Sequence, residues 1–112
     1  MKFQIDKFAE IAEKIRSSDV YDVYDYRFLK NHVVSMTFLH PGKETSGHSH
    51  DKEEEVYIFL DGAGEMQLGS KRFAVAKGDV VLIRGGEFHK VFNPKGPGDL
   101  KFFCVFEKYK GR

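Results

Sequence analysis

Cysteine, tryptophan and proline are scarce in this chain. Its 112 residues include one cysteine, three prolines and no tryptophan. A single cysteine, Cys104, excludes an internal disulfide and cannot by itself build a zinc site from paired cysteines. The fold therefore does not depend on an oxidising compartment, and we expect a cytoplasmic protein.

No sign of charge predominates, and long hydrophobic runs are missing. Lys and Arg number 18 against 17 Asp and Glu, which gives a formal net charge of +1. This balance predicts no basic face for nucleic acid or acidic lipid. No segment reaches the roughly 18 apolar residues of a membrane-spanning helix, and the charged N-terminal stretch has no signal-peptide core. The expected partner is a small molecule, either anionic or sugar-like.

One segment near the N-terminus has helical periodicity. Its apolar residues recur at the spacing of an amphipathic helix, at Ile5, Phe8, Ile11, Ala12 and Ile15. Asp6 is a possible N-cap, and Ser17-Ser18 would close the helix. We therefore divide the chain into a helical segment, residues 1–18, that packs outside a single domain, residues 19–112.

The rest of the chain is typical of antiparallel β-structure. Short β-branched and aromatic runs alternate with turn signals that contain Gly, Pro and Asp. The runs are "HVVSMTFL", "EVYIFL", "GEMQL", "RFAVA", "DVVLI", "HKVF" and "KFFCVF". With no second helix for a parallel crossover, they predict a small barrel of Greek-key or jelly-roll type. Apolar residues such as Phe3, Phe8 and Ile11 on the outer segment favour a homodimer.

Three histidines and a glutamate form a candidate metal site. On an extended strand His48 and His50 face the same side, about 7 Å apart at the backbone. Glu55 begins the next apolar run, and His89 begins a later strand after a Gly-Gly turn. A set of three imidazoles and one carboxylate suits a divalent Mn, Fe, Co, Ni or Zn ion and leaves two octahedral positions open.

The spacing of these residues resembles the two sequence motifs of the cupins. The first motif is met by Gly42, His48, His50, Glu55 and Gly62, and the second by Gly78, Gly86, His89 and Asn93. Arg84 stands where the family usually has Pro. The resemblance implies an all-β cupin jelly-roll barrel, here with a short N-terminal helix, and metal ligation by His48, His50, Glu55 and His89.

The stretch from Ser46 to Leu68 is similar to that of mannose-6-phosphate isomerase-like cupins and of archaeal cupin-type glucose-6-phosphate isomerases. The likeness implies a metal-dependent isomerase or epimerase on a sugar or sugar phosphate. Arg84 is the candidate contact for an anionic group, and Tyr57 shares the ligand face and could hydrogen-bond a substrate. A non-haem Fe(II) dioxygenase and a non-catalytic metal- or ligand-binding module are the alternatives, because a cupin fold does not choose a reaction.

Overall fold

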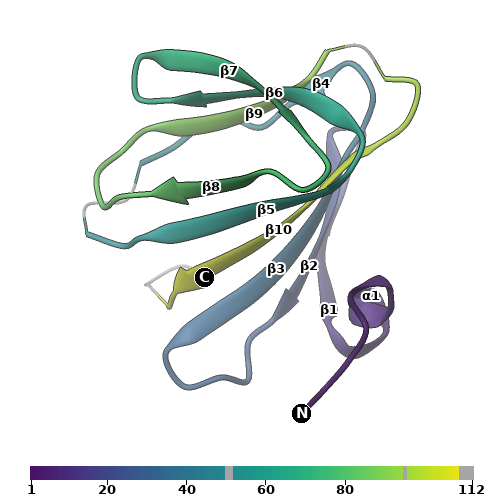
Figure 1. Cartoon of the computed structure of the whole chain (residues 1–112). Coiled ribbons are helices and arrows are strands. Elements are labelled where there is room, and N and C mark those ends of the chain that lie inside the picture. Colours follow the sequence, from purple (N-terminus) through teal and green to yellow (C-terminus); the bar gives the residue numbers. More distant parts are fainter. Residues whose placement is uncertain (50–51, 95, 109–112) are drawn as a thin grey trace.

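Ten strands and one short N-terminal helical segment make up the structure, a computed structural model that describes residues 1–49, 52–94 and 96–108 (Figure 1). The helical segment comprises η1 (Ile5–Lys7) and α1 (Phe8–Ile11). The strands are β1 (Glu13–Ser17), β2 (Tyr21–Tyr26), β3 (His32–Leu39), β4 (Lys43–Glu44), β5 (Glu55–Asp61), β6 (Ala63–Leu68), β7 (Lys71–Ala76), β8 (Val80–Ile83), β9 (His89–Asn93) and β10 (Leu100–Glu107). The predicted all-β architecture is confirmed.

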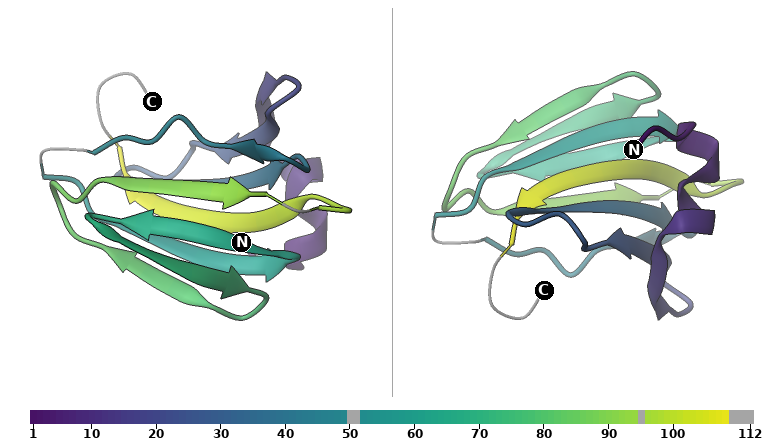
Figure 2. Two further views of the ribbon diagram at one scale, coloured as in Figure 1. Left: turned by 90° about the horizontal axis from the view of Figure 1, so that it is seen from above. Right: turned by 90° about the horizontal axis from the view of Figure 1, so that it is seen from below.

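The strands form two antiparallel layers that face each other. One sheet has the order β1-β2-β3-β10-β5-β8 and the other the order β4-β9-β6-β7. Figure 1 shows the smaller sheet above the larger one, and the views from above and below in Figure 2 show the helix beside the strands rather than between the layers. No helix among the described residues is long and apolar enough to cross a membrane.

The space between the sheets holds an aromatic and aliphatic core at one end and polar side chains at the other. Inward positions alternate along each strand, as in Val81 and Ile83 of β8, which are buried while their neighbours are exposed. The buried hydrophobic residues include Phe59, Met66, Val91, Leu100 and Phe102. Six polar residues are also buried among the described ones: Asp25, Ser35, Thr37, Glu55, His89 and Asn93. Burying polar groups is costly unless they are bonded. Glu55 and His89 are paired with each other at one end of the barrel, whereas Asn93 lies at the far end of β9.

The N-terminal segment differs from its prediction. The helix ends at Ile11, since Ala12 is already extended, and residues 13–17 form strand β1. Asp6 lies in the first turn rather than at the N-cap, where Gln4 makes no side-chain cap. A short helical pattern does not separate helix from strand, and an isolated helix of this length is marginal in water. Pairing with β2 gives residues 13–17 backbone hydrogen-bond partners that a solitary helix end lacks.

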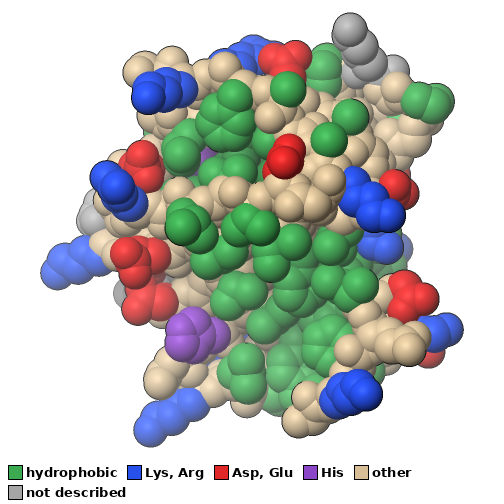
Figure 3. All heavy atoms as spheres, in the orientation of Figure 1, with side chains coloured by type: hydrophobic (Ala, Val, Ile, Leu, Met, Phe, Trp, Pro, Cys, Tyr) green, Lys and Arg blue, Asp and Glu red, His purple; other side chains and the backbone are tan. Residues whose placement is uncertain are grey.

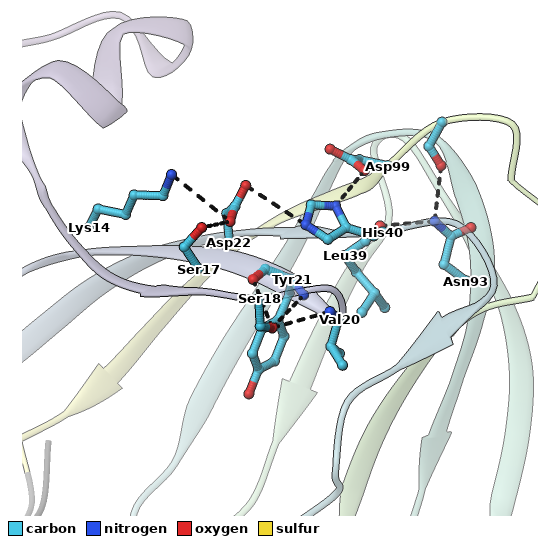
Figure 4. Close-up of polar contacts among 11 residues, drawn as sticks. Lys14, Ser17, Ser18, Val20, Tyr21, Asp22, Leu39, His40, Asn93 and Asp99 are labelled. Atoms are coloured by element: carbon cyan, nitrogen blue, oxygen red, sulfur yellow. Dashed lines mark hydrogen bonds and ion pairs between the residues drawn. The ribbon is translucent and has the colours of Figure 1, made fainter.

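Residues Ser17 to Tyr21 connect β1 and β2 instead of ending a helix (Figure 4). The Ser18 hydroxyl oxygen accepts hydrogen bonds from the backbone N–H groups of Val20 and Tyr21, at 3.1 and 3.3 Å. The Ser18 N–H in turn donates to the Tyr21 carbonyl at 3.0 Å. Serine here supplies the local side-chain bonds that favour turns.

Polar contacts tie the strands together at the end of the barrel where β3 finishes and β10 begins. The His40 Nδ1 atom lies 2.9 Å from Asp99 Oδ1, and its Nε2 atom lies 3.8 Å from Asp22 Oδ2. The buried Asn93 amide donates to the Leu39 carbonyl at 2.9 Å and to the Gly98 carbonyl at 3.0 Å (Figure 4). Asn93 of the second motif is therefore a structural residue that satisfies two carbonyls.

Two glycines of β5–β6 allow close approach of backbones, as expected for this barrel. Gly62 has φ +85°, and a Cβ there would lie 2.8 Å from the Asp99 carbonyl oxygen. A Cβ at Gly64 would lie 2.4 Å from the Phe92 carbonyl oxygen. Any larger residue would push β6 away from β9.

The outer face of the six-stranded sheet is also apolar. Figure 3 shows hydrophobic side chains gathered over β5, β10 and β3. The helix covers part of this face, because Phe8 is fully buried there with its ring 5.0 Å from that of Phe103. The expectation that Phe8 is left uncovered on the outside is therefore wrong. On β8, by contrast, Val80 and Leu82 remain 57% and 68% exposed.

Candidate metal centre

Three of the four expected ligands come together between the sheets, each placed by a different piece of backbone. Glu55 is the first residue of β5, and His89 is the first residue of β9. His48 follows β4 and forms a two-residue bridge with His89. In this bridge the His48 N–H donates to the His89 carbonyl at 3.1 Å, and the His89 N–H donates to the His48 carbonyl at 2.9 Å. The backbone pairing thus sets the two imidazoles side by side.

The side chains converge on one point. The His89 Nε2 atom lies 2.7 Å from Glu55 Oε2, and both side chains are almost fully buried, at 2% and 5% exposure. The ring centroids of His48 and His89 are 4.4 Å apart. One ligand atom from each of His48, Glu55 and His89 lies within 4.8 Å of the other two. This cluster is therefore able to hold a metal ion.

A backbone contact orients His89 for ligation. Its Nδ1 atom lies 3.0 Å from the Glu87 carbonyl oxygen, which can only accept a hydrogen bond. The proton of a neutral ring is thereby held on Nδ1, and Nε2 is left to face Glu55 and the centre of the cluster. Metal-binding histidines in proteins are fixed in this way by a bond from the other ring nitrogen. The donor set and its orientation both fit a divalent transition metal.

The same contacts shift the protonation of His89. Burial lowers the pKa of its imidazole, but the hydrogen bonds to Glu55 and to the Glu87 backbone, with the negative charges of both carboxylates, outweigh burial. The pKa of His89 is therefore raised above its ordinary 6.5. A metal ion must displace the proton from Nε2 in order to bind. Because the pKa is raised, this proton competes with the metal up to a higher pH than it would at an ordinary histidine.

The cluster opens onto a cavity of about 270 Å³, called here the inner cavity. His48 and Glu55 form part of its wall, and side-chain hydroxyl groups form much of the rest, from Tyr21, Ser35, Thr37, Thr45, Ser46 and Tyr57. Phe102, Cys104 and Phe106 supply the apolar part. Such a wall suits a small polar ligand.

The other expected site residues are Tyr57, Arg84 and His50, and they do not all lie at the cluster. Tyr57 is buried and lines the inner cavity, with its ring stacked on Phe102 at 5.4 Å and edge-on to His89 at 5.7 Å. Arg84 is exposed and lines a separate groove with Lys71 and Glu87. The Arg84 N–H donates to Glu87 Oε1 at 2.8 Å, a bond that the family's proline could not make. His50 lies outside the described residues.

Sequence reasoning missed one charged residue of this site. Arg16 lines the inner cavity, but the predicted helix over residues 1–18 had placed it outside the barrel. The sequence held a usable signal, since "SSDV" followed by an alternating run indicates a turn and a second strand.

A jelly-roll barrel whose His-Glu-His cluster is able to hold a metal ion defines a class of β-barrel domains, and comparison with known proteins agrees. Residues 35–106 match the family described as the cupin domain. The chain therefore belongs to the cupin family, as its motifs predicted.

Individual proteins are also similar to this chain. The chain is 40% identical over 63 residues to an uncharacterised protein of Methanocaldococcus jannaschii, covering 56% of this chain and 50% of the other. It is 36% identical over 67 residues to the oxalate-binding protein of Thermotoga maritima, covering 60% and 54%. The chain thus spans about half the length of these curated relatives. A double-stranded β-helix protein from Klebsiella pneumoniae superposes with a TM-score of 0.79 at 20% identity, covering 99% and 92%.

Removing one imidazole should abolish stoichiometric metal binding. We expect the parent protein to hold about one divalent ion per chain and His48→Ala to bind it more than about tenfold more weakly, because ligand geometry sets the affinity. Elemental analysis and metal titration measure this. His32→Ala, at an exposed histidine of β3, is the control, and His50→Ala extends the test to the fourth expected ligand. Equal metal content in parent and His48→Ala would contradict the assignment.

The raised pKa of His89 predicts a pH dependence of the metal-free protein. A folded-state pKa above the unfolded value stabilises the fold fully below the unfolded pKa, near 6.5, and this contribution is lost as pH rises through the folded pKa. In chelator, the thermal midpoint should therefore fall as the pH rises above about 6.5. The fall should be smaller in His89→Gln, which has no ionisable ring. An equal fall in both proteins would rule out His89 as its source.

Proposed function

We propose that this protein holds a divalent metal with His48, His50, Glu55 and His89 and binds a small carboxylate ligand beside it. The observation that carries the proposal is the opening of the cluster of His48, Glu55 and His89 onto a polar cavity of about 270 Å³. A bound divalent ion supplies positive charge and open positions for ligand oxygen atoms. The hydroxyl groups of the wall offer hydrogen bonds to a ligand's remaining oxygens.

A relative's name supports the choice of ligand. The Thermotoga maritima protein that matches 60% of this chain is named an oxalate-binding protein. Oxalate is therefore the first ligand to test here.

The isomerase hypothesis requires a catalytic base in the site, which ligand binding does not. An aldose–ketose isomerisation needs a base that takes a proton from one carbon and returns it to the next. Among the described residues that line the inner cavity, Glu55 is the only carboxylate, and it is held 2.7 Å from His89 in the cluster. Ligand binding needs no such base. We therefore place carboxylate binding first and keep the sugar isomerase and the Fe(II) dioxygenase as enzyme alternatives.

The proposal predicts metal-dependent binding of oxalate. Isothermal titration of the metal-loaded protein should give one site per chain, because the charge of the ion provides most of the attraction for a small anion. The chelator-treated protein and His48→Ala should both show at least about tenfold weaker binding. Binding that persists without metal would contradict the proposal.

Turnover assays on the same preparations separate the alternatives. Oxygen uptake by the Fe(II)-loaded protein would support the dioxygenase. Anaerobic interconversion of sugar phosphates, followed by NMR, would support the isomerase. Oxalate binding with neither reaction leaves a ligand-binding cupin, which is the outcome we expect.

We also propose that the chain forms a homodimer through the outer face of its larger sheet. β8 is an edge strand whose outward side chains, Val80 and Leu82, are exposed. They continue the apolar outer face of β5 and β10, which Phe8 covers only in part. An exposed apolar edge strand favours pairing with a second copy.

Sedimentation velocity tests the homodimer. The parent should sediment as a dimer and Leu82→Glu as a monomer, because burying an unpaired carboxylate at the interface costs on the order of several kcal/mol of association free energy. Lys30→Glu, at an exposed position between β2 and β3 and therefore away from β8 in the sheet order, also introduces a carboxylate and should stay dimeric. A monomeric parent would rule out this assembly.

A further inference from the structure

The first strand contains an irregularity that determines where Arg16 points. Lys14 pairs with Tyr24, but Arg16 pairs with Val23, so Ile15 is an extra residue in β1. A regular antiparallel ladder would set Arg16 opposite Asp22. Since neighbouring strand positions face opposite sides, the bulge moves Arg16 to the inward side of the sheet with Val23. β-Bulges re-aim side chains in this way beside functional sites.

Arg16 lies at the entrance of the inner cavity. It lines that cavity with His48 and Glu55, and it also lines a second hollow between β1 and the segment after β4, called here the outer groove. Ser46, two residues before His48, belongs to both hollows as well. One continuous wall therefore leads from the Arg16 side chain to the metal cluster.

The positive charge of Arg16 is not neutralised by its described neighbours. In residues 1–49, 52–94 and 96–108, its side chain forms no ion pair or hydrogen bond. Two carboxylates line the outer groove, and each has another partner. Asp19 lies 3.6 Å from the Lys43 amine, and Glu44 lies 2.9 Å from the Lys90 amine. Arg16 is thus an exposed residue at the cavity entrance, and none of the described side chains pairs with its charge.

We propose that Arg16 binds the second anionic group of a dianionic ligand whose first anionic group lies at the metal cluster. This inference rests on the proposed function and narrows its ligand class from carboxylates in general to dianions, dicarboxylates above all. A guanidinium matches a carboxylate with two parallel hydrogen bonds. A monocarboxylate at the metal would leave Arg16 without a partner, so Arg16 selects for the second charge.

The test compares ligands that differ in the second charge. The probes are oxalate, malonate and succinate against acetate and propionate, titrated calorimetrically into the Mn²⁺-loaded protein. Arg16→Gln should weaken at least one dicarboxylate about tenfold or more, as expected for a charge-assisted pair, and the monocarboxylates less than about twofold. Arg16→Lys should recover part of the loss, because it keeps the charge without the planar fork.

Two controls keep the result specific to Arg16. Lys14→Gln removes a charge from the outward face of the same strand and should leave every affinity unchanged. Metal content should be equal in all variants, because Arg16 is not a ligand. Higher salt should weaken dicarboxylate binding more in the parent than in Arg16→Gln.

Each contrary result has a distinct meaning. Equal dicarboxylate affinity in parent and Arg16→Gln would overturn the role of Arg16 and leave the proposed function intact. Equal losses for mono- and dicarboxylates would also overturn it, since a general structural effect explains them. If Arg84→Gln weakened dicarboxylate binding and Arg16→Gln did not, the anion contact would lie at Arg84, in the groove outside the inner cavity, and the role of Arg16 would be overturned. A parent that binds no carboxylate with metal present would overturn both proposals.

Discussion

The contact between His89 and Glu55 is the constraint on which the interior of this barrel depends. The two side chains are almost fully buried, with Nε2 and Oε2 2.7 Å apart. A buried ion pair gains little over apolar packing, and loss of either partner leaves a costly group behind. The pair is better explained by ligation, because the ring is oriented by the Glu87 carbonyl and His48 lies beside it. The polar atoms of this pair therefore lie in the barrel interior at a point where they could coordinate a metal ion.

Both sheets contribute residues to the candidate metal centre. Glu55 comes from the larger sheet, and His89 comes from the smaller one, with His48 attached to it by a backbone bridge. Any shift of one layer over the other would separate Glu55 from the imidazoles. Distant contacts resist such a shift, among them the Asn93 amide on the carbonyls of Leu39 and Gly98 and the close approach of Gly64 to the Leu100 side chain of β10. Asn93, a motif residue outside the expected ligand set, thus helps to hold the layers in the register that the ligands need.

Under the proposed function, charge at the cavity entrance would add a second level of selection. A metal ion held by the cluster would attract anions of many kinds, whereas Arg16 lines the same cavity and is placed by the bulge in β1. The outer strand pair is therefore part of the site as well as cover for the barrel. The apolar outer face and the polar inner cavity lie on opposite sides of one sheet, so ligand binding and association with a second copy can occupy the same domain without competing.

Much of this protein was determined by the sequence alone, because its signals are local or have fixed spacing. The short β-branched runs "HVVSMTFL" and "DVVLI", bounded by turn signals, predicted strands β3 and β8, and the two motifs predicted the family and the cluster of His48, Glu55 and His89. Arg16 and Arg84 could not be placed in this way. For Arg16, a helical pattern of five apolar residues concealed a strand with a bulge. For Arg84, the sequence contains no signal that its side chain lines a groove outside the inner cavity. Only the tertiary structure decided which arginine lies at the cavity, because a one-residue change of register in β1 turns a side chain from one face of the sheet to the other.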